Sequence, residues 1–185
     1  MDADKTKQRR AALAARRAMT AAARASASAA ICFRLLALPQ LRSAKTILSY
    51  RALDDEADVG AVEGKLKARI AYPRCLGQGV MEARIPLGPM KPGPYGIWEP
   101  DPEASLPLSP EEIDLVLLPC VAFDRFGHRL GHGAGYYDRY LPRCDRAKTI
   151  LVAFAAQELA HVATEKHDRN ADILVTEREI ITPGE

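Results

Sequence analysis

The sequence has no long apolar segment. None of its 185 residues lies in an apolar run that approaches the roughly 20 residues needed to cross a bilayer. The first residues also lack the apolar stretch and the small-residue cleavage site of a secretory signal. These absences argue against a membrane-bound or secreted protein. We expect a cytoplasmic protein that does not bind membranes.

Cysteine is scarce, and its spacing gives no sign of metal binding. The cysteines are far apart and form no C-x-x-C pair; they are Cys32, Cys75, Cys120 and Cys144. In a reducing compartment such cysteines stay as thiols, so the sequence predicts neither disulfides nor a structural zinc site. Cys120 follows a strand with the pattern of a buried one, which argues against a nucleophilic role.

Net charge is small, because 26 Lys and Arg residues are balanced by 24 Asp and Glu residues, for a formal charge of +2. Proteins that bind nucleic acid by electrostatic attraction carry a larger basic excess, and no recognised nucleic-acid motif is present. Basic residues are nevertheless concentrated in residues 1–24. We interpret this stretch as a helix with a solvated basic face; a nucleic-acid arm and a mitochondrial transit peptide remain alternatives. We expect a monomer that binds small molecules and no nucleic acid.

Apolar and charged residues occur in the proportions of a globular protein, 48% and 27% of the chain. Three segments are apolar on both faces of a strand, at residues 115–118, 149–154 and 172–176. Such strands are typical of a parallel sheet that is covered on both sides. We therefore predict an α/β fold in a single domain of residues 1–185. Its mainly parallel, Rossmann-like sheet is flanked by helices on both faces in three layers.

Local patterns predict the remaining segments. Residues 1–38 are rich in good helix formers and predict two helices, with Thr20 as the N-cap of the second. Further along, the predictions are a strand at 46–50, a helix at 59–69, a strand at 69–73 that stops at proline, and a strand at 80–85. Residues 86–110 are rich in Pro and Gly and predict a long irregular surface loop.

A glycine-rich stretch at residues 119–141 is the most informative part of the chain. It follows an apolar run and precedes a segment, starting at Tyr136, that is compatible with a helix. Three glycines alternate with other residues in this stretch: Gly131, Gly133 and Gly135. Glycine permits positive φ and close backbone approach, so the three can turn their N–H groups toward one anion, and Arg129 adds a guanidinium suited to phosphate oxygens. The spacing matches neither the dinucleotide fingerprint nor the P-loop, and on its own it also occurs in ordinary turns.

The whole string carries more information than the glycines. Residues 119–138 read P-C-V-A-F-D-R-F-G-H-R-L-G-H-G-A-G-Y-Y-D. This closely resembles the segment P-G-x-x-F-D-x-x-G-x-R-L-G-x-G-x-G-Y-Y-D of the 5-formyltetrahydrofolate cyclo-ligases, also called 5,10-methenyltetrahydrofolate synthetases. Three shorter segments resemble family motifs in the expected order: residues 5–9 (K-x-x-L-R, with Gln8 in place of Leu), 96–100 (G-I-x-E-P) and 165–168 (E-x-H-D).

The resemblance implies an ATP site beside a folate site. The implied ATP-binding residues are Lys5, Arg9, Arg129, Leu130, Gly131, His132, Gly133, Ala134, Gly135, Tyr136 and Tyr137. The implied folate-binding residues are Glu56, Arg51, His132, Gly133, Ala134, Gly135 and Tyr136, with Asp55 as an alternative to Glu56. Arg129 and Tyr136 are the implied catalytic residues, and Tyr136 or Tyr137 would form a wall of the folate site. The implied cofactor is Mg²⁺, held by Asp138 and Asp168, since a hard cation prefers oxygen ligands.

The implied reaction is the ATP-dependent closure of 5-formyltetrahydrofolate to 5,10-methenyltetrahydrofolate, with release of ADP and phosphate. Phosphoryl transfer needs cations and N–H donors rather than a side-chain nucleophile. The sequence leaves three other classes open. These are a nucleotide- or folate-binding module without turnover, a small nucleic-acid-binding protein that uses the basic first helix, and a sugar-phosphate enzyme on a similar sheet.

Residues 95–99 place aromatic side chains and a carboxylate inside the predicted loop, including the only tryptophan, Trp98. One interpretation puts them beside the folate site, in line with the family motif. The other is that the aromatic rings attach the loop to the core. Of the remaining histidines, His128 is expected to form hydrogen bonds within its loop and His161 to lie on a helix surface.

Overall fold

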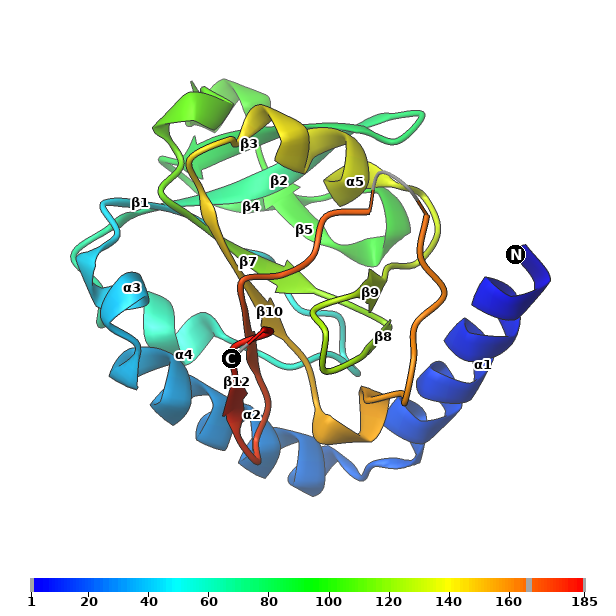
Figure 1. The fold of residues 1–185 in the computed structure, drawn as a ribbon. Coiled ribbons are helices and arrows are strands. Elements are labelled where there is room, and N and C mark those ends of the chain that lie inside the picture. Colours follow the sequence, from blue (N-terminus) through cyan, green and yellow to red (C-terminus); the bar gives the residue numbers. More distant parts are fainter. Residues whose placement is uncertain (1, 166–167, 185) are drawn as a thin grey trace.

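The computed structural model describes residues 2–165 and 168–184. Lys166 and His167, which belong to the predicted E-x-H-D element, lie outside the described residues. A central sheet has helices on either side and one long helix along its flank (Figure 1). The α-helices are α1 (Asp2–Ala18), α2 (Ala21–Ala37), α3 (Pro39–Ser43), α4 (Gly60–Glu63) and α5 (Tyr136–Tyr140). None of the described helices is long and apolar enough to cross a membrane.

In the described residues the central sheet has eight strands, in the order β12-β11-β10-β7-β1-β2-β3-β6. They are β1 (Thr46–Leu48), β2 (Arg69–Gly77), β3 (Val80–Pro86), β6 (Ser105–Leu108), β7 (Leu115–Pro119), β10 (Lys148–Val152), β11 (Ile173–Val175) and β12 (Ile180–Ile181). The strands from β11 to β2 in this order are parallel, and β12, β3 and β6 are added antiparallel at the edges. The predicted α/β fold with a mainly parallel sheet is confirmed.

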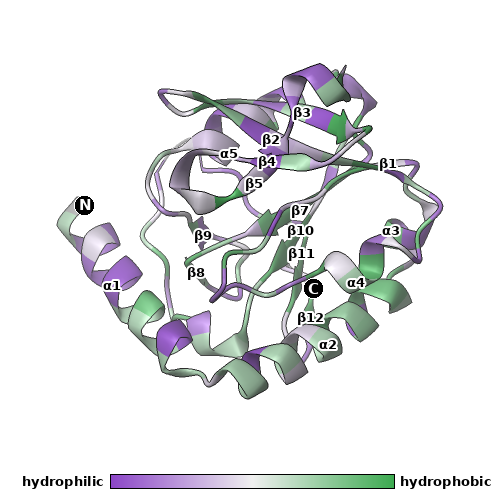
Figure 2. Cartoon of the chain, turned by 180° about the vertical axis from the view of Figure 1, so that it is seen from behind, coloured by the Kyte–Doolittle hydropathy of each residue, from purple (hydrophilic) through white to green (hydrophobic). Residues whose placement is uncertain are grey.

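Both faces of the sheet are covered because its central strands are apolar on both sides. In β7, Leu115 and Leu117 belong to a buried cluster with residues of α2 and α4. Val116 and Leu118, which alternate with them, pack on the opposite side with Tyr140 of α5. Figure 2 shows the resulting concentration of hydrophobic residues in β7, β10 and β11. The sheet is therefore the middle of three layers, as predicted.

The two predicted N-terminal helices are α1 and α2. Thr20 caps α2 as predicted, since its Oγ1 accepts a hydrogen bond of 3.1 Å from the backbone N–H of Ala23. Helix α1 lies outside the three layers and packs through Ala12 and Leu13 against a small two-stranded hairpin. The hairpin consists of β8 (Ala122–Phe123) and β9 (Arg129–Leu130). This contact places α1 beside the end of β7, from which the hairpin emerges.

The largest errors in the predicted element boundaries concern one helix and one strand. The predicted helix at 59–69 is reduced to α4, which has four residues and ends before Gly64. The predicted end of β2 at Pro73 is also wrong, because β2 continues to Gly77. Beyond Ala71, β2 is no longer paired with β1, so a residue that lacks an N–H group is tolerated there.

The prediction of an irregular loop at 86–110 is wrong as well. The segment contains a second small hairpin, β4 (Met90–Pro92) with β5 (Trp98–Pro100), and then β6, which joins the edge of the central sheet. Short 3₁₀ helices lie between and after these strands: η1 (Pro94–Gly96), η2 (Pro102–Ala104) and η3 (Pro110–Glu112). Prolines are compatible with these strands because each strand has only one neighbour and its other edge needs no N–H donors.

The order of strands creates a switch point between β1 and β7. The chain passes from β1 to β2 on one side and later returns to place β7 on the other side of β1. At such a point the loops that follow the two strands diverge and leave room for a ligand. Residues 49–58 follow β1, and the hairpin with the glycine stretch follows β7.

Candidate active site at the carboxyl ends of β1 and β7

The glycine loop, residues 131–135, lies just beyond the carboxyl end of β7. The backbone N–H of Val121, two residues after β7, donates to the carbonyl of Leu130 at 2.7 Å and closes the hairpin there. Gly133 and Gly135 have φ values of +103° and +71°, as predicted for a turn of this kind, and Gly135 is the residue before α5. Gly131 is not among the residues with positive φ.

Arg9 of α1 contacts the glycine loop directly. Its Nε donates to the carbonyl oxygen of Gly131 at 3.0 Å. A Cβ atom added at Gly133 would lie 3.7 Å from the Arg9 guanidinium carbon. The structure thus brings together residues that are more than 120 positions apart and that the sequence assigned to one ATP site.

Lys5 lies one helical turn before Arg9 and is only 8% exposed. Its Nζ is 3.1 Å from Glu165 and 3.3 Å from Asp168. Burial disfavours the charged amine, but the hydrogen bonds and attraction of the two carboxylates outweigh this and raise the pKa of Lys5. The interpretation of α1 as a helix with a solvated basic face is therefore wrong for Lys5.

Gln8 attaches the same helix to the segment that follows η5 (Ala155–Gln157). Its Nε2 donates to the carbonyl of His161 at 2.8 Å, and its Oε1 accepts from the N–H of Ala163 at 3.1 Å. The leucine common in the family motif has no such groups. Gln8 therefore attaches α1 by hydrogen bonds that a leucine could not make.

Arg16 was missed as a site residue by the sequence interpretation. Its side chain is 1% exposed and contacts Asp55 at 2.8 Å and Glu56 at 3.4 Å. No local signal could have found it: Arg16 lies on the same face of α1 as Ala12, four residues earlier, but the burial of that face is known only from the structure. Its Nε has no hydrogen-bond partner among the described residues. One buried guanidinium thus holds both candidate folate carboxylates.

Glu56 connects this pair to the glycine loop. Its Oε1 is 3.3 Å from Nε2 of His132, and its Oε2 accepts from the N–H of Leu53 at 3.1 Å. The contact with His132 crosses the switch point between β1 and β7. Asp55 contacts Arg16 and Arg17. The choice of Glu56 over Asp55 as the folate ligand stays a prediction.

Arg51 is not part of this ion-pair network. Its guanidinium lies 4.5 Å from the centre of the Tyr72 ring, and its Nη1 is 3.8 Å from Glu63. Arg51 and Glu56 nevertheless border the same surface cavity of about 590 Å³, between α2 and residues 51–58. Both are thus accessible to a ligand that enters from that side.

The two predicted magnesium ligands each contact a basic residue of the predicted ATP site. Asp138, in the first turn of α5, accepts a hydrogen bond of 2.7 Å from Arg129, which is 8% exposed. Asp168 contacts Lys5 and also accepts from the N–H of Glu165 at 2.7 Å. Carboxylate oxygens that balance cations at a phosphate site are suitable ligands for Mg²⁺. This donor chemistry fits the predicted metal.

Tyr136 begins α5 and contacts residues 95–99, the segment for which the sequence allowed two interpretations. The Tyr95 ring contacts it edge-on, with ring centres 6.3 Å apart and planes at 76°. The contact with Tyr95, together with burial, raises the pKa of Tyr136. Burial and the neighbouring Glu99 raise the pKa of the Cys75 thiol to about 12. Trp98 is 56% exposed, so its ring does not bury the loop against the core.

Tyr137 and Ala134 have different surroundings from Tyr136. The Tyr137 hydroxyl is buried and has no hydrogen-bond partner among the described residues, and burial raises its pKa. The Ala134 carbonyl accepts a hydrogen bond of 2.8 Å from Arg139. Gly79, in the turn between β2 and β3, packs against Ala134 and Arg139, since an added Cβ would lie 2.7 Å from the Ala134 carbonyl oxygen. The β2–β3 turn thus supports the glycine loop.

This fold and site define an α/β protein with a glycine-rich loop at the switch point of a mainly parallel sheet. A model of the 5-formyltetrahydrofolate cyclo-ligase family matches residues 1–177. The chain belongs to this family, and it is therefore a ligase of folate-dependent one-carbon metabolism.

Individual relatives agree with the family. The chain is 32% identical over 142 residues to the 5-formyltetrahydrofolate cyclo-ligase of Haemophilus influenzae, covering 72% of this chain and 76% of the relative. It is 28% identical over 179 residues to a probable cyclo-ligase of Schizosaccharomyces pombe, covering 84% and 86%. Among solved structures, the 5,10-methenyltetrahydrofolate synthetase of Aquifex aeolicus superposes with a TM-score of 0.85 at 27% identity, covering 98% of this chain and 93% of that one.

Proposed function

We propose that this protein converts 5-formyltetrahydrofolate to 5,10-methenyltetrahydrofolate in a reaction that consumes ATP, requires Mg²⁺ and releases ADP and phosphate. The observation that carries the proposal is the meeting of two sets of residues at the switch point. Arg9 contacts the glycine loop on one side, and His132 of the same loop contacts Glu56 on the other. The candidate phosphate and folate residues thus share one loop.

The chemistry follows from the poor leaving ability of the formyl oxygen. Transfer of the γ-phosphoryl group of ATP to that oxygen gives ADP and an oxygen that can leave as phosphate. Attack of N10 on the formyl carbon then closes the ring, and departure of phosphate with loss of the N10 proton leaves the methenyl group. A protein that catalyses these steps must position the two substrates and stabilise negative charge.

The basic residues and backbone donors of the site suit these requirements. The N–H groups of the glycine loop can point at phosphate oxygens, because positive φ at Gly133 and Gly135 turns the backbone there. Arg129, Lys5 and Arg9 supply positive charge from β9 and from two successive turns of α1. Arg129 is nearly buried, so its charge is less screened by water than that of a surface arginine.

Asp138 and Asp168 would hold Mg²⁺ against the phosphates. The bound ion would neutralise charge on the β- and γ-phosphates. Because each carboxylate contacts a cation in this structure, metal and nucleotide binding would redistribute these ion pairs among Arg129, Lys5 and the phosphates.

Glu56 and Tyr136 would bind the folate. A carboxylate can accept paired hydrogen bonds from the amino-pyrimidine edge of a pterin. Arg16 fixes the Glu56 carboxylate in place, and the Tyr136 ring, packed against Tyr95, offers an aromatic wall.

The test is to mix the purified protein with 5-formyltetrahydrofolate, ATP and Mg²⁺ and to follow methenyl absorbance and ADP release together. We expect one ADP for each methenyl group formed, and no product after addition of a chelator. If ATP and folate bind but neither product forms, the protein is a binding module. If the folate product forms without ATP, phosphoryl activation is wrong.

Replacing Asp138 by asparagine is expected to raise the Mg²⁺ concentration for half-maximal rate by about tenfold or more, since the ion loses a charged ligand. The rate should be measured across a Mg²⁺ titration at saturating ATP. Asp145→Asn, at an exposed position shortly after α5, is the matched control and should leave the titration unchanged. An unchanged titration for both Asp138→Asn and Asp168→Asn would remove these residues from the metal site.

Replacing Gly131 by alanine is expected to weaken the binding of ATP without destabilising the fold. Its φ is not positive and a Cβ there meets nothing within 4 Å, so the free energy of unfolding should stay unchanged. If phosphates lie against this backbone, the added methyl group should raise the KM for ATP by about tenfold, or 1.4 kcal/mol. Gly64→Ala, also unobstructed but outside the loop, should change neither quantity. A normal KM for Gly131→Ala would argue against close phosphate contact at this residue.

A further inference from the structure

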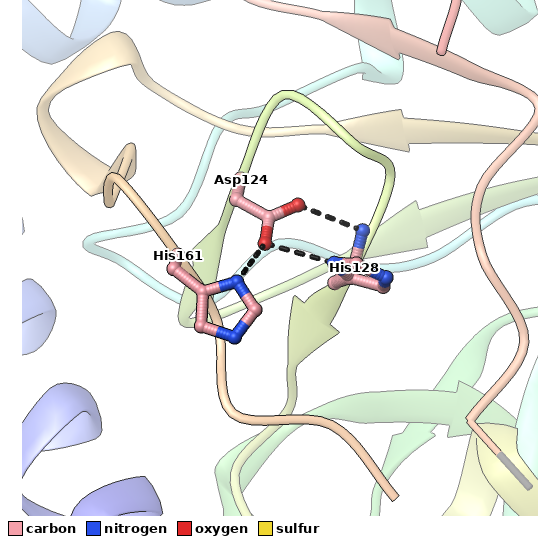
Figure 3. A group of neighbouring side chains, drawn as sticks. All are labelled: Asp124, His128 and His161. Atoms are coloured by element: carbon pink, nitrogen blue, oxygen red, sulfur yellow. Dashed lines mark hydrogen bonds and ion pairs between the residues drawn. The ribbon is translucent and has the colours of Figure 1, made fainter. Parts of the chain in front are cut away.

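A cluster of metal-binding side chains lies in the turn of the β8–β9 hairpin, away from the glycine loop at its open end. Asp124 and His128 come from the turn, and His161 comes from the extended segment after η5 (Figure 3). His161 is not on a helix, so the sequence expectation for it is wrong. All three point their polar atoms at one place, within 4.8 Å of one another.

The Asp124 carboxylate is fixed before any ion arrives. It is fully buried, its Oδ1 accepts from the backbone N–H groups of Phe126 and His128, and its Oδ2 accepts from the N–H of Val162. Such contacts orient a metal ligand. Oδ2 is also the carboxylate oxygen that the two imidazoles approach.

The imidazoles converge on this oxygen. Nδ1 of His128 is 2.9 Å from Oδ2, and Nδ1 of His161 is 3.8 Å from the same atom. A hydrogen bond accounts for the first contact, as expected for His128, but 3.8 Å is too long for the second. Neighbouring ligands around a tetrahedral ion with bonds of 2.0–2.1 Å lie about 3.3 Å apart, which is between the two observed distances.

The surroundings leave room for an ion and for water. The side chain of His161 is 70% exposed and that of His128 is 23% exposed. The neighbouring cation, Arg125, is engaged by Glu158 and Glu179, so its charge is balanced.

We propose that Asp124, His128 and His161 bind a divalent transition-metal ion of the Zn²⁺ class, with water completing the coordination. Two imidazole nitrogens and one carboxylate oxygen suit Zn²⁺, Co²⁺ or Ni²⁺ and are a poor match for Mg²⁺, which prefers oxygen ligands. The ion would tie the segment after η5, which Gln8 attaches to α1, to the turn of the hairpin that carries the glycine loop. This site is separate from the residues proposed for Mg²⁺ and does not depend on the proposed reaction.

The test is a titration of the metal-free protein with Co²⁺, whose visible spectrum reports a low-coordinate site with nitrogen ligands. We expect one equivalent to bind with visible bands, Zn²⁺ to displace it, and millimolar Mg²⁺ to leave it in place. His161→Ala and His128→Asn should each lower the affinity for Co²⁺ by at least about 10- to 100-fold. Even the loss of a residue that only hydrogen-bonds a metal ligand typically lowers metal affinity by this much. Asp124→Asn is less suitable, because this carboxylate also holds three backbone N–H groups.

Two control variants separate this site from other ligands in the chain. His132→Ala removes an exposed histidine outside the cluster. Cys75→Ser removes a half-buried thiol, whereas the other cysteines of the described residues are buried. Both should bind Co²⁺ like the parent protein, and Zn²⁺ should raise the midpoint of thermal unfolding in them but not in His161→Ala. The proposal would be overturned by absence of stoichiometric binding, by parental affinity in the two cluster variants, or by loss of the signal in Cys75→Ser.

Discussion

Replacing Arg129 by alanine is expected to lower kcat by about 100-fold or more, with a smaller change in KM for either substrate. A fixed donor aimed at charge that develops in the transition state typically contributes this much, and more when it is shielded from water. Arg129 is 8% exposed and is held in place by Asp138 at 2.7 Å. The measurement is steady-state formation of the methenyl product at saturating ATP and folate.

A matched surface arginine separates this role from a general loss of charge. Arg146→Ala, at an exposed position shortly after α5, should retain normal kcat. Arg129→Lys keeps the charge but loses the planar pair of donors, so it should recover only part of the rate. Thermal unfolding of each variant shows whether the fold is intact. Near-normal kcat in a folded Arg129→Ala protein would remove this residue from the mechanism.

Replacing Arg16 by alanine is expected to reduce the free energy of unfolding by about 3 kcal/mol or more. Removal of one partner from a buried ion pair leaves the other charge without compensation. Here the guanidinium is 1% exposed and lies between Asp55 and Glu56, whose side chains are 21% and 7% exposed. Urea unfolding followed by circular dichroism measures the loss.

The adjacent arginine provides the control. Arg17 is 70% exposed and lies 3.5 Å from the same Asp55, so Arg17→Ala should change the stability by less than about 1 kcal/mol. We also expect Arg16→Ala, where it remains folded, to raise the KM for folate more than the KM for ATP, because Glu56 loses its support. Equal stability losses in the two variants would mean that the burial of Arg16 contributes little.

Local patterns were sufficient to predict the elements whose own residues specify them. The apolar runs at β7, β10 and β11 indicated strands buried on both faces, and Thr20 indicated the start of α2. The glycine spacing indicated a loop whose backbone can adopt positive φ, as Gly133 and Gly135 do. These features depend on side-chain shape and backbone freedom within a few residues, so they are readable from a short window.

Predictions failed where the partner strand decided the outcome. Pro73 lies within β2, and the Pro-rich segment 86–110 adds strands at sheet edges, because a strand without a neighbour on one side tolerates proline.

The burial of two charged residues of α1 was also not predicted. Lys5 and Arg16 are buried, although their neighbours in sequence suggested a solvated helix. Their carboxylate partners lie 39 to 163 positions away. No local pattern contains that information.

The sequence by itself determined the family, the α/β class and the glycine loop, because these depend on a long specific motif and on apolar runs. Only the tertiary structure decided which charges meet. It brought Arg9 to Gly131, Arg16 to Glu56, and His161 to Asp124. The physical reason is that the groups within a few ångströms of a charge decide whether that charge is stabilised. Those distances are set by the packing of α1 and of the segment after η5 against the hairpin. They cannot be read from the spacing of residues along the chain.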